Sequence, residues 1–340
     1  MIPIQNIYYM LSYAFQVLNE QGYKNIATEQ FHNTAELMAA ILEKGIAIQL
    51  KRGLGKEYIP QTEALSSLRG KIDIAESIKT QSMLRKQLIC TYDEFSVNSI
   101  MNRIIKSTVE LLLRSNISKQ RKKNLRKLMV YFSEVDFIDS YTVNWNVQYN
   151  RNNQISICYL VVKGLLQTQS NGHTKLMDFL DEQRMCRLYE KFILEYYRKE
   201  FKNQITANAS QIPWQLDNEE NSMLSVMQSD IMLQSGEKVL IIDAKYYEHS
   251  TQVQFDKHTL HSGNLYQIFT YVKNKEYELR EKDHTVSGML LYAKTDEEIY
   301  PNNVYQMSGN QIDVRTLDLN LPFDEIASQL NTIAKTHFDL

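Results

Sequence analysis

The residues of this sequence with the clearest chemical potential are three charged side chains around a hydrophobic run. Asp243 and Lys245 follow the apolar residues Val-Leu-Ile-Ile, and Asp230 lies thirteen residues before Asp243. An ionic side chain beside a hydrophobic core is costly unless it pairs with another charge or binds a metal. The pattern therefore indicates either an ion pair or a metal site.

Residues 229–245 are predicted to form a β-hairpin with a Ser-Gly turn between its strands. Because strand side chains alternate between two faces, Asp243 and Lys245 point the same way, and pairing across the turn brings Asp230 beside Asp243. Two carboxylates this close repel each other unless a cation lies between them. With the backbone carbonyl of Ala244, they form an oxygen-ligand set that suits Mg²⁺. Lys245 is then expected to orient or deprotonate a water, or to offset charge on a phosphate.

A simpler interpretation of the same residues remains open. Asp243 and Lys245 form a salt bridge at a strand end, and Asp230 is an ordinary turn residue. A D…DxK pattern is short and arises often by chance, so it does not identify a nuclease by itself.

A second feature follows the hairpin in "HSGNLYQIFTYVKN", which is predicted to be a helix. Gln267 and Tyr271 are four residues apart and therefore share one helix face. A strand-borne D…DxK followed by a helix with QxxxY resembles the RecB-type branch of the PD-(D/E)xK nuclease superfamily. The resemblance implies catalytic roles for Asp230, Asp243, Lys245, Gln267 and Tyr271. One departure is Ser229 in place of the superfamily's proline, at a position that is not a metal ligand.

The helix predicted before the hairpin offers a further carboxylate, Glu190 or Glu195. On a helical wheel Glu195 flanks the apolar stripe of that helix, formed by Met185, Leu188 and Phe192, whereas Glu190 points away from it. The wheel favours Glu195, but a solvated position for either residue is equally compatible, and the choice stays open.

The elements that must position these residues fall into two predicted domains. The first, residues 1–168, is expected to be α+β; the second, 169–340, is expected to be an α/β nuclease domain with a mixed sheet flanked by helices. The polar string at Gln167 to Thr174 predicts the linker. In the first domain, spacing and caps predict helices over 4–18, 33–44, 98–114 and the basic segment that follows, with short strands between 46 and 74.

Composition limits the other functions. The 340 residues carry a net charge of −2, so general attraction to nucleic acid is not expected. "RSNISKQRKKNLRK", from Arg114 to Lys127, is the exception, with seven cations and no acid. It is either a solvated helix face or a surface that follows phosphates. Three widely spaced cysteines, no signal peptide and no membrane-length apolar run predict a cytoplasmic protein without a membrane partner.

The chain as a whole resembles the McrC family, the nuclease subunits of McrBC modification-dependent restriction systems. The resemblance rests on the blocks "IPIQNIYYMLSYAF", "RGL", "RGKIDI", "NRIIKST", "IIDAKYY" and "NLYQIFTY". It implies double-stranded DNA as substrate and a McrB-like AAA+ GTPase hexamer as partner, which this subunit stimulates. No P-loop is found in the sequence, so GTP is expected only through that partner. The basic helix becomes a candidate DNA or partner contact, and residues 46–74 become the candidate motor-engaging segment.

Two other classes stay open. The chain could be a RecB-type nuclease that acts alone in DNA repair, or a non-catalytic adaptor that regulates an NTPase. The intact set of Asp230, Asp243 and Lys245 argues against the adaptor, and the missing motor argues against a solitary processive enzyme.

Overall fold

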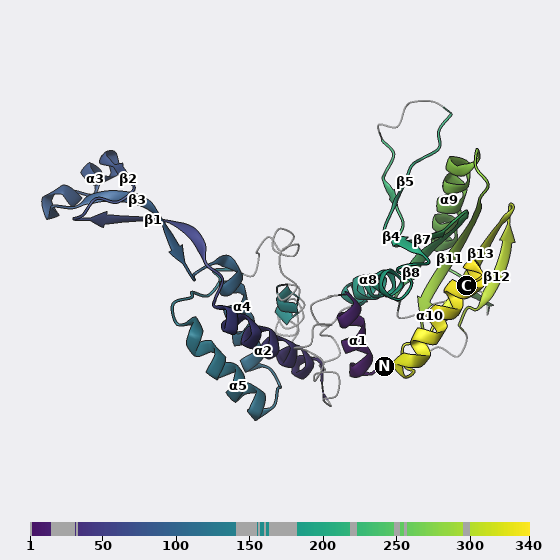
Figure 1. Cartoon of the computed structure of the whole chain (residues 1–340), viewed down its shortest axis with the longest axis horizontal. Coiled ribbons are helices and arrows are strands. Elements are labelled where there is room, and N and C mark those ends of the chain that lie inside the picture. Colours follow the sequence, from purple (N-terminus) through teal and green to yellow (C-terminus); the bar gives the residue numbers. More distant parts are fainter. Residues whose placement is uncertain are drawn as a thin grey trace. The chain divides into compact units, whose positions relative to one another are not determined.

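The structure, a computed structural model, describes residues 2–14, 31, 33–140, 155, 157–159, 161–162, 182–217, 223–247, 252–254, 257–294 and 300–340. The chain forms two compact units (Figure 1), one of Met1–His32 with Leu180–Leu340 and the other of Asn33–Phe179. The predicted linker at Gln167 to Thr174, and with it the predicted domain boundary, lies outside the described residues.

The unit that contains the hairpin is built around a six-stranded mixed sheet. Its elements are α1 (Ile4–Ala14), α8 (Glu182–Glu200), β4 (Thr206–Asn208), β5 (Gln211–Ile212), β6 (Met227–Gln228), β7 (Ile231–Ser235), β8 (Lys238–Lys245), β9 (Gln252–Gln254), β10 (Lys257–Thr259), α9 (Ser262–Leu279), β11 (Thr285–Ala293), β12 (Asn303–Met307), β13 (Asn310–Leu317) and α10 (Phe323–Phe338). The strand order is β12-β13-β11-β8-β7-β4, in which β8, β11 and β13 run parallel. The predicted mixed sheet flanked by helices is therefore confirmed.

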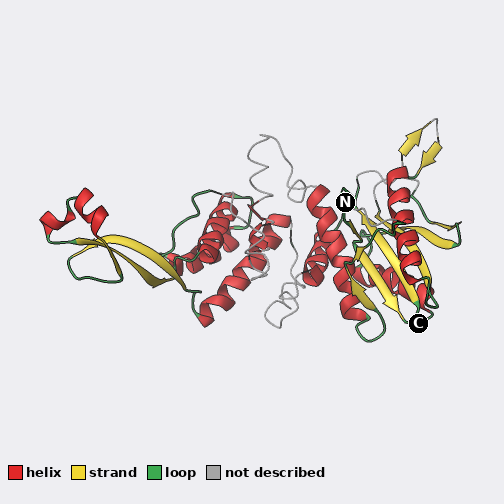
Figure 2. Ribbon diagram, turned by 90° about the horizontal axis from the view of Figure 1, so that it is seen from above, coloured by secondary structure: helices red, strands yellow, loops and turns green. Residues whose placement is uncertain are grey.

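Helices cover both faces of this sheet (Figure 2). On one face, Ile268 and Val272 of α9 join the buried core with alternate residues of β8, β11 and β13. On the other face, α8 and α10 lie side by side, because the hydroxyl of Tyr197 donates to the carbonyl of Leu330 over 3.0 Å. Side chains of β8 therefore alternate between the two faces: Val239 and Ile241 point toward α9, and the residues that alternate with them point toward α8.

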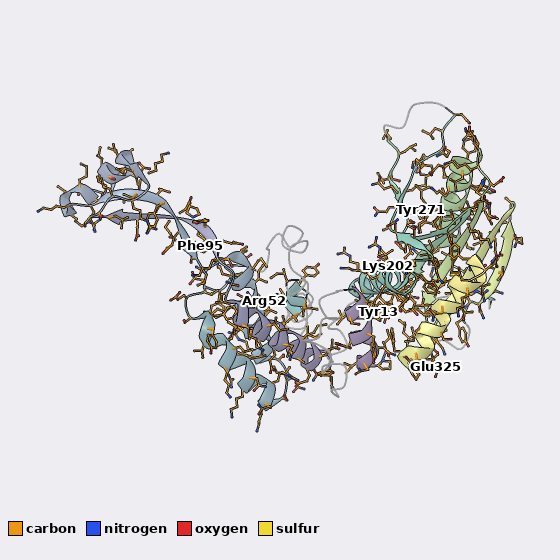
Figure 3. All side chains as sticks on the ribbon, viewed as in Figure 1. Tyr13, Arg52, Phe95, Lys202, Tyr271 and Glu325 are labelled. Carbon is orange, nitrogen blue, oxygen red and sulfur yellow. The ribbon has the colours of Figure 1, made fainter. Side chains whose placement is uncertain are left out.

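The first helix packs in this same unit, although it was expected in the other domain. The amide of Asn6 donates to the carbonyls of Leu319 and Leu321, both at 2.8 Å. The ring of Tyr13, labelled in Figure 3, lies 5.7 Å from that of Phe192 on α8. The prediction assigned residues 1–168 to one domain, but α1 belongs to the unit that contains the hairpin. The difference arises because α1 contacts residues that are remote from it in sequence.

The second unit is α+β. Between residues 33 and 140 its elements are α2 (Thr34–Arg52), β1 (Glu57–Leu65), β2 (Lys71–Asp73), α3 (Ile74–Lys79), η3 (Ser82–Arg85), β3 (Leu88–Ser96), α4 (Ile100–Arg114), α5 (Lys119–Met129) and η4 (Val130–Phe132). The strands form an antiparallel sheet in the order β1-β3-β2. Asn33 caps α2 as predicted, because its side chain accepts from the N–H of Glu36 at 2.8 Å.

One prediction in this unit is wrong. Residues 46–52 are the last turns of α2 and not strand. The alternation of apolar and polar residues suggested a strand, but α2 ends only where Gly53 takes a φ of 86° and its N–H bonds to the carbonyl of Leu50. A glycine at the carboxyl end of a helix is a common stop signal because it tolerates positive φ.

Candidate functional site

The hairpin brings the three charged residues together at its open end. β7 and β8 are antiparallel with Ile231 opposite Ile242, so the next pair outward in this register is Asp230 with Asp243. The turn contains Gly236 at a φ of 56°, which a glycine adopts without strain. The N–H of Ala244 donates to Oδ2 of Asp230 over 2.9 Å, which fixes that carboxylate against β8.

Asp243 is buried and incompletely satisfied. Its side chain is 1% exposed, and Nζ of Lys245 approaches its Oδ2 to 2.8 Å as an ion pair. Apart from this ion pair, Oδ2 has no hydrogen-bond partner among the described residues. A buried carboxylate oxygen in this condition is a position where a cation would be stabilising.

The electrostatics of the pair favour a charged lysine. Burial raises the pKa of Asp243 to about 7; Lys245 opposes this change, and the charge of Asp230 adds to it. Burial alone would lower the pKa of Lys245, but Asp243 outweighs that effect, so the pKa is raised. Of the roles expected for Lys245, the structure therefore favours a cation that orients a water or offsets phosphate charge over a base that removes a proton.

Helix α9 supports this lysine through a chain of side chains. Nζ of Lys245 donates to Oε1 of Gln267 over 3.3 Å, and Nε2 of Gln267 donates to the hydroxyl of Tyr271 over 2.9 Å. Tyr271, labelled in Figure 3, is 8% exposed and belongs to the core beneath α9. The structure thus joins Gln267 and Tyr271 to the site through Lys245.

Tyr292 next to Lys245, and Asn264 hydrogen-bonded to that tyrosine, are two further polar residues near the site that were not identified from the sequence. Tyr292 of β11 stands opposite Lys245 in the parallel pairing, and its hydroxyl accepts from Nδ2 of Asn264 over 2.9 Å. Burial raises the pKa of Tyr292, and the charge of Asp243 adds to this change while that of Lys245 opposes it. Asn264 is three residues before Gln267, so a search of the same helix face would have found it.

Of the two carboxylates left open on α8, Glu190 is the one at the site. Burial raises its pKa to about 7, with Asp230 and Asp243 also raising it and Lys245 lowering it. Glu195 instead accepts from Nη1 of Arg198 over 2.7 Å. The helical wheel favoured Glu195 because it took the buried face of α8 to be the stripe of Met185, Leu188 and Phe192. The buried face is wider and includes Ile193 and Tyr197, and Glu190 lies on the side of these two residues.

The residues present fit a hard divalent cation, with water completing its shell. Within the described ranges, no three His, Cys, Asp or Glu side chains come together as a ready ligand cluster. Asp230, Asp243 and the carbonyl of Ala244 supply oxygen alone, and Mg²⁺ usually binds through one or two carboxylates while keeping several waters. The unsatisfied oxygen of Asp243 is the observation that supports this fit.

Other expectations concern the cysteines and the membrane. In the part of the chain that the structure describes, Cys90, Cys158 and Cys186 form no disulfide. Burial raises the pKa of Cys158 to about 12, which leaves its thiol unreactive. Among the described helices, none combines the length and apolarity needed to cross a bilayer.

By its fold and site, this chain is an α/β protein in which two carboxylates and a lysine lie at the ends of adjacent strands of a mixed sheet. A family model described as "McrBC 5-methylcytosine restriction system component" matches residues 5–293. The chain belongs to this family, and the resemblance drawn from its sequence blocks is confirmed.

Two relatives illustrate the relationship. The chain is 30% identical, over 343 residues, to "Type IV methyl-directed restriction enzyme EcoKMcrBC" of Escherichia coli (strain K12), with 97% of the chain and 96% of that protein covered. A solved structure, "Refined half-complex from tetradecameric assembly of Thermococcus gammatolerans McrB AAA+ hexamers with bound McrC", is similar with a TM-score of 0.50 and 16% identity, covering 97% of this chain and 76% of that one. At this identity the likeness shows the fold alone.

Proposed function

We propose that this chain is the endonuclease subunit of a modification-dependent restriction complex and that its nuclease domain is of the PD-(D/E)xK type. It hydrolyses phosphodiesters of double-stranded DNA with Mg²⁺ and stimulates a McrB-like AAA+ GTPase hexamer. The observation that carries the proposal is the convergence of Asp230, Asp243 and Lys245 at the open end of one hairpin. Such a complex would act on DNA in the cytoplasm.

Each residue of the site has a distinct task. Asp230, Asp243 and the carbonyl of Ala244 would hold Mg²⁺, which supplies a polarised phosphate and an activated water. Lys245 remains cationic and lies against Asp243, where it can orient that water or bind a phosphate oxygen. Gln267 fixes the ammonium group of Lys245, and Tyr271 fixes Gln267.

Glu190 is the candidate for an additional carboxylate. Its carboxyl feels the charges of Asp230 and Asp243, so a cation between them would also stabilise its ionised form. We infer that Glu190 contributes to the metal environment directly or through a bound water.

The GTPase partner is inferred from the family and from the similar solved complex, in which McrC is bound to McrB AAA+ hexamers. The candidate contact is the sheet of β1, β2 and β3 together with the end of α2. Arg52 and Phe95, labelled in Figure 3, mark this region. Large apolar side chains are exposed on this sheet, on the loop between β1 and β2, and on the adjoining α3 and η3, and they are Tyr58, Leu68, Ile74, Ile78, Met83, Leu84 and Phe95. Exposed apolar groups interspersed with cations are typical of a surface that a partner covers.

The other two classes are less well supported. An adaptor without catalysis would not need the buried Asp243, whose burial is costly without a cation. A nuclease that acts alone has no evident use for the exposed apolar sheet of the second unit.

The test is DNA cleavage and GTP hydrolysis measured side by side with the purified partner and Mg²⁺. Asp243→Ala is expected to lose cleavage while stimulating GTP hydrolysis as the wild type does. Asp324→Ala, which removes an exposed carboxylate of α10, is the control and should retain both activities. Cleavage at the wild-type rate by Asp243→Ala would refute the assignment of the site.

A further inference from the structure

The outward face of α5 carries five cations that have no partner among the described residues. They are Lys119, Lys122, Lys123, Arg126 and Lys127. All except the half-buried Lys122 are exposed, and none of the five side chains makes a hydrogen bond or ion pair with any other residue in the described ranges. Arg114, just before this helix, is by contrast paired with Glu110 at 3.0 Å.

The opposite face of α5 is firmly held by α2. Glu36 accepts from the N–H of Ser118 at 2.7 Å, and Nη1 of Arg121 donates to Glu43 over 2.9 Å. Asn124 donates to the same Glu43 at 2.9 Å. These contacts occupy Arg121, which points inward, and fix the rotation of α5 about its axis, so the other five cations are displayed outward.

The cations are regularly spaced along the helix. Lys119, Lys123 and Lys127 recur every four residues and form one row, and Lys122 with Arg126 forms an adjoining row. Five charges thus lie within about 12 Å of helix axis, roughly one per 2 to 3 Å. Duplex DNA carries about one charge per 1.7 Å of its axis, which is a similar density. A polyanion would relieve the mutual repulsion of these cations.

The composition of the face distinguishes its ligand. Four of the five cations are lysines, and lysine is depleted at the cores of protein–protein interfaces but common at DNA phosphates. Tyr131, which is 66% exposed just beyond the helix, offers a hydroxyl donor of the kind that also contacts phosphates.

We propose that the outward face of α5 binds the phosphate backbone of duplex DNA. This proposal deepens the proposed function by assigning a second contact with the substrate to the unit that does not contain Asp230, Asp243 and Lys245. It rests on the proposed function for the identity of the polyanion. Because the contacts are to phosphates, binding here is independent of base sequence and of base modification.

The experiment is binding of the full chain to a fluorescent duplex of about 30 base pairs in EDTA, over a series of salt concentrations. Lys123→Gln with Lys127→Gln should weaken binding about tenfold or more near 100 mM salt and make the log–log salt slope shallower by about 1.8, or 0.9 per phosphate contact. Lys123→Arg with Lys127→Arg keeps the charges and should bind as the wild type does.

The control removes the same number of charges at paired positions of the same unit. Arg114→Gln with Lys79→Gln alters cations already neutralised by Glu110 and Glu76, and it should leave affinity and slope nearly unchanged. An equal loss in both double variants would refute a specific surface on α5. Unchanged DNA binding in the α5 variant would also refute the proposal, because the face would then be merely solvated. If that variant loses only stimulation of the GTPase, the face binds protein and the proposal is likewise refuted.

Failure of the proposed function would look different. If the wild type binds the duplex through α5 but does not cleave it with partner and Mg²⁺, the surface stands and the nuclease assignment falls. Identical melting temperatures of all variants would show that the exposed substitutions leave the fold intact, as is usual for surface changes.

Discussion

The backbone N–H of Ala244 and Oδ2 of Asp230 are joined by a hydrogen bond of 2.9 Å across the open end of the hairpin. This bond ties the carboxylate of one strand to the backbone of the other, directly beside Asp243. The distance between the two carboxylates is therefore set by the strand register and not by flexible side chains, so the ligands are preorganised for a cation.

This bond makes Asp230→Asn a clean test of charge. The asparagine carbonyl can accept the same hydrogen bond, so the metal-free fold should survive, but a ligand charge is lost. Added Mg²⁺ should raise the melting temperature of the wild type in a concentration-dependent way and leave that of the variant unchanged. The variant should also cleave DNA at least about a hundredfold more slowly. Equal stabilisation of both proteins by Mg²⁺ would exclude Asp230 as a ligand.

Glu190 and Glu195 form a matched pair on one helix. Glu190→Gln should lower the cleavage rate by about tenfold or more, because its carboxyl is coupled to both aspartates. Glu195→Gln removes only a partly exposed pair with Arg198 and should cost less than about 1 kcal/mol of stability and no activity. Steady-state cleavage and thermal melting check both variants, and a larger loss in Glu195→Gln would reverse the assignment.

The buried Asp243 predicts an unusual pH dependence of stability in the metal-free protein. Its pKa in the folded state is raised to about 7, above the value near 4 of an unfolded chain, so the folded state binds the extra proton between these values. This contribution is fully present below about pH 4 and is lost as pH rises to about 7. In EDTA, the free energy of unfolding of the wild type should therefore fall relative to that of Asp243→Asn by about 2.5 kcal/mol between about pH 5 and 8. Denaturant titrations at several pH values measure this, and parallel curves would contradict it.

Packing beneath α9 can be tested without touching the site. A methyl group at Gly288 would lie within 2.9 Å of side-chain atoms of Ile268, Val272 and Ile312. Gly288→Ala should cost about 1 to 3 kcal/mol by overpacking and displace α9, so that Gln267 no longer holds Lys245. Gly263→Ala on the same helix meets no atom within 4 Å and is the control, expected to be neutral or stabilising. Unaltered stability and cleavage in Gly288→Ala would show that α9 adapts freely.

The engagement of the motor should be separable from cutting. Arg52 and Lys56 are exposed, and Nζ of Lys56 lies 5.7 Å from the centre of the exposed ring of Phe95. Arg52→Ala with Lys56→Ala should weaken stimulation of the partner GTPase and reduce cleavage with it, while melting as the wild type does. GTP turnover at several partner concentrations measures the effect. Full stimulation by this double variant would exclude these two cations from the contact.

The sequence predicts those parts of the site that depend on local periods. The alternation along β8 correctly places Asp243 and Lys245 on one face. The predicted Ser-Gly turn is displaced by one residue, because Ser235 pairs with Lys238 and the two turn residues are Gly236 and Glu237, and this register is the one that sets Asp230 opposite Asp243. The four-residue spacing of Gln267 and Tyr271 likewise follows from helix geometry alone.

Features that depend on the packing of distant segments could not be predicted from local sequence patterns. The choice between Glu190 and Glu195 requires the rotation of α8 against the sheet, which is set by side chains of several strands. The position of Tyr292 beside Lys245 requires the parallel pairing of β8 with β11, and such a pairing leaves no short-range signal. The helical state of residues 46–52 shows that an alternating pattern is overridden when a helix already runs into it.

The packing of α1 with α8 sets an order of events during synthesis. Ile7, Met10 and Leu11 of α1 are buried in the finished unit, yet α8 begins only at Glu182. At usual translation rates, the apolar face of α1 would stay without α8 for roughly 10 to 30 s after its synthesis. The second unit, which lies between α1 and α8 in the sequence, can fold as it emerges. The unit proposed to meet the motor is therefore synthesised in full before the unit proposed to cut, whose core cannot be complete until synthesis is nearly finished.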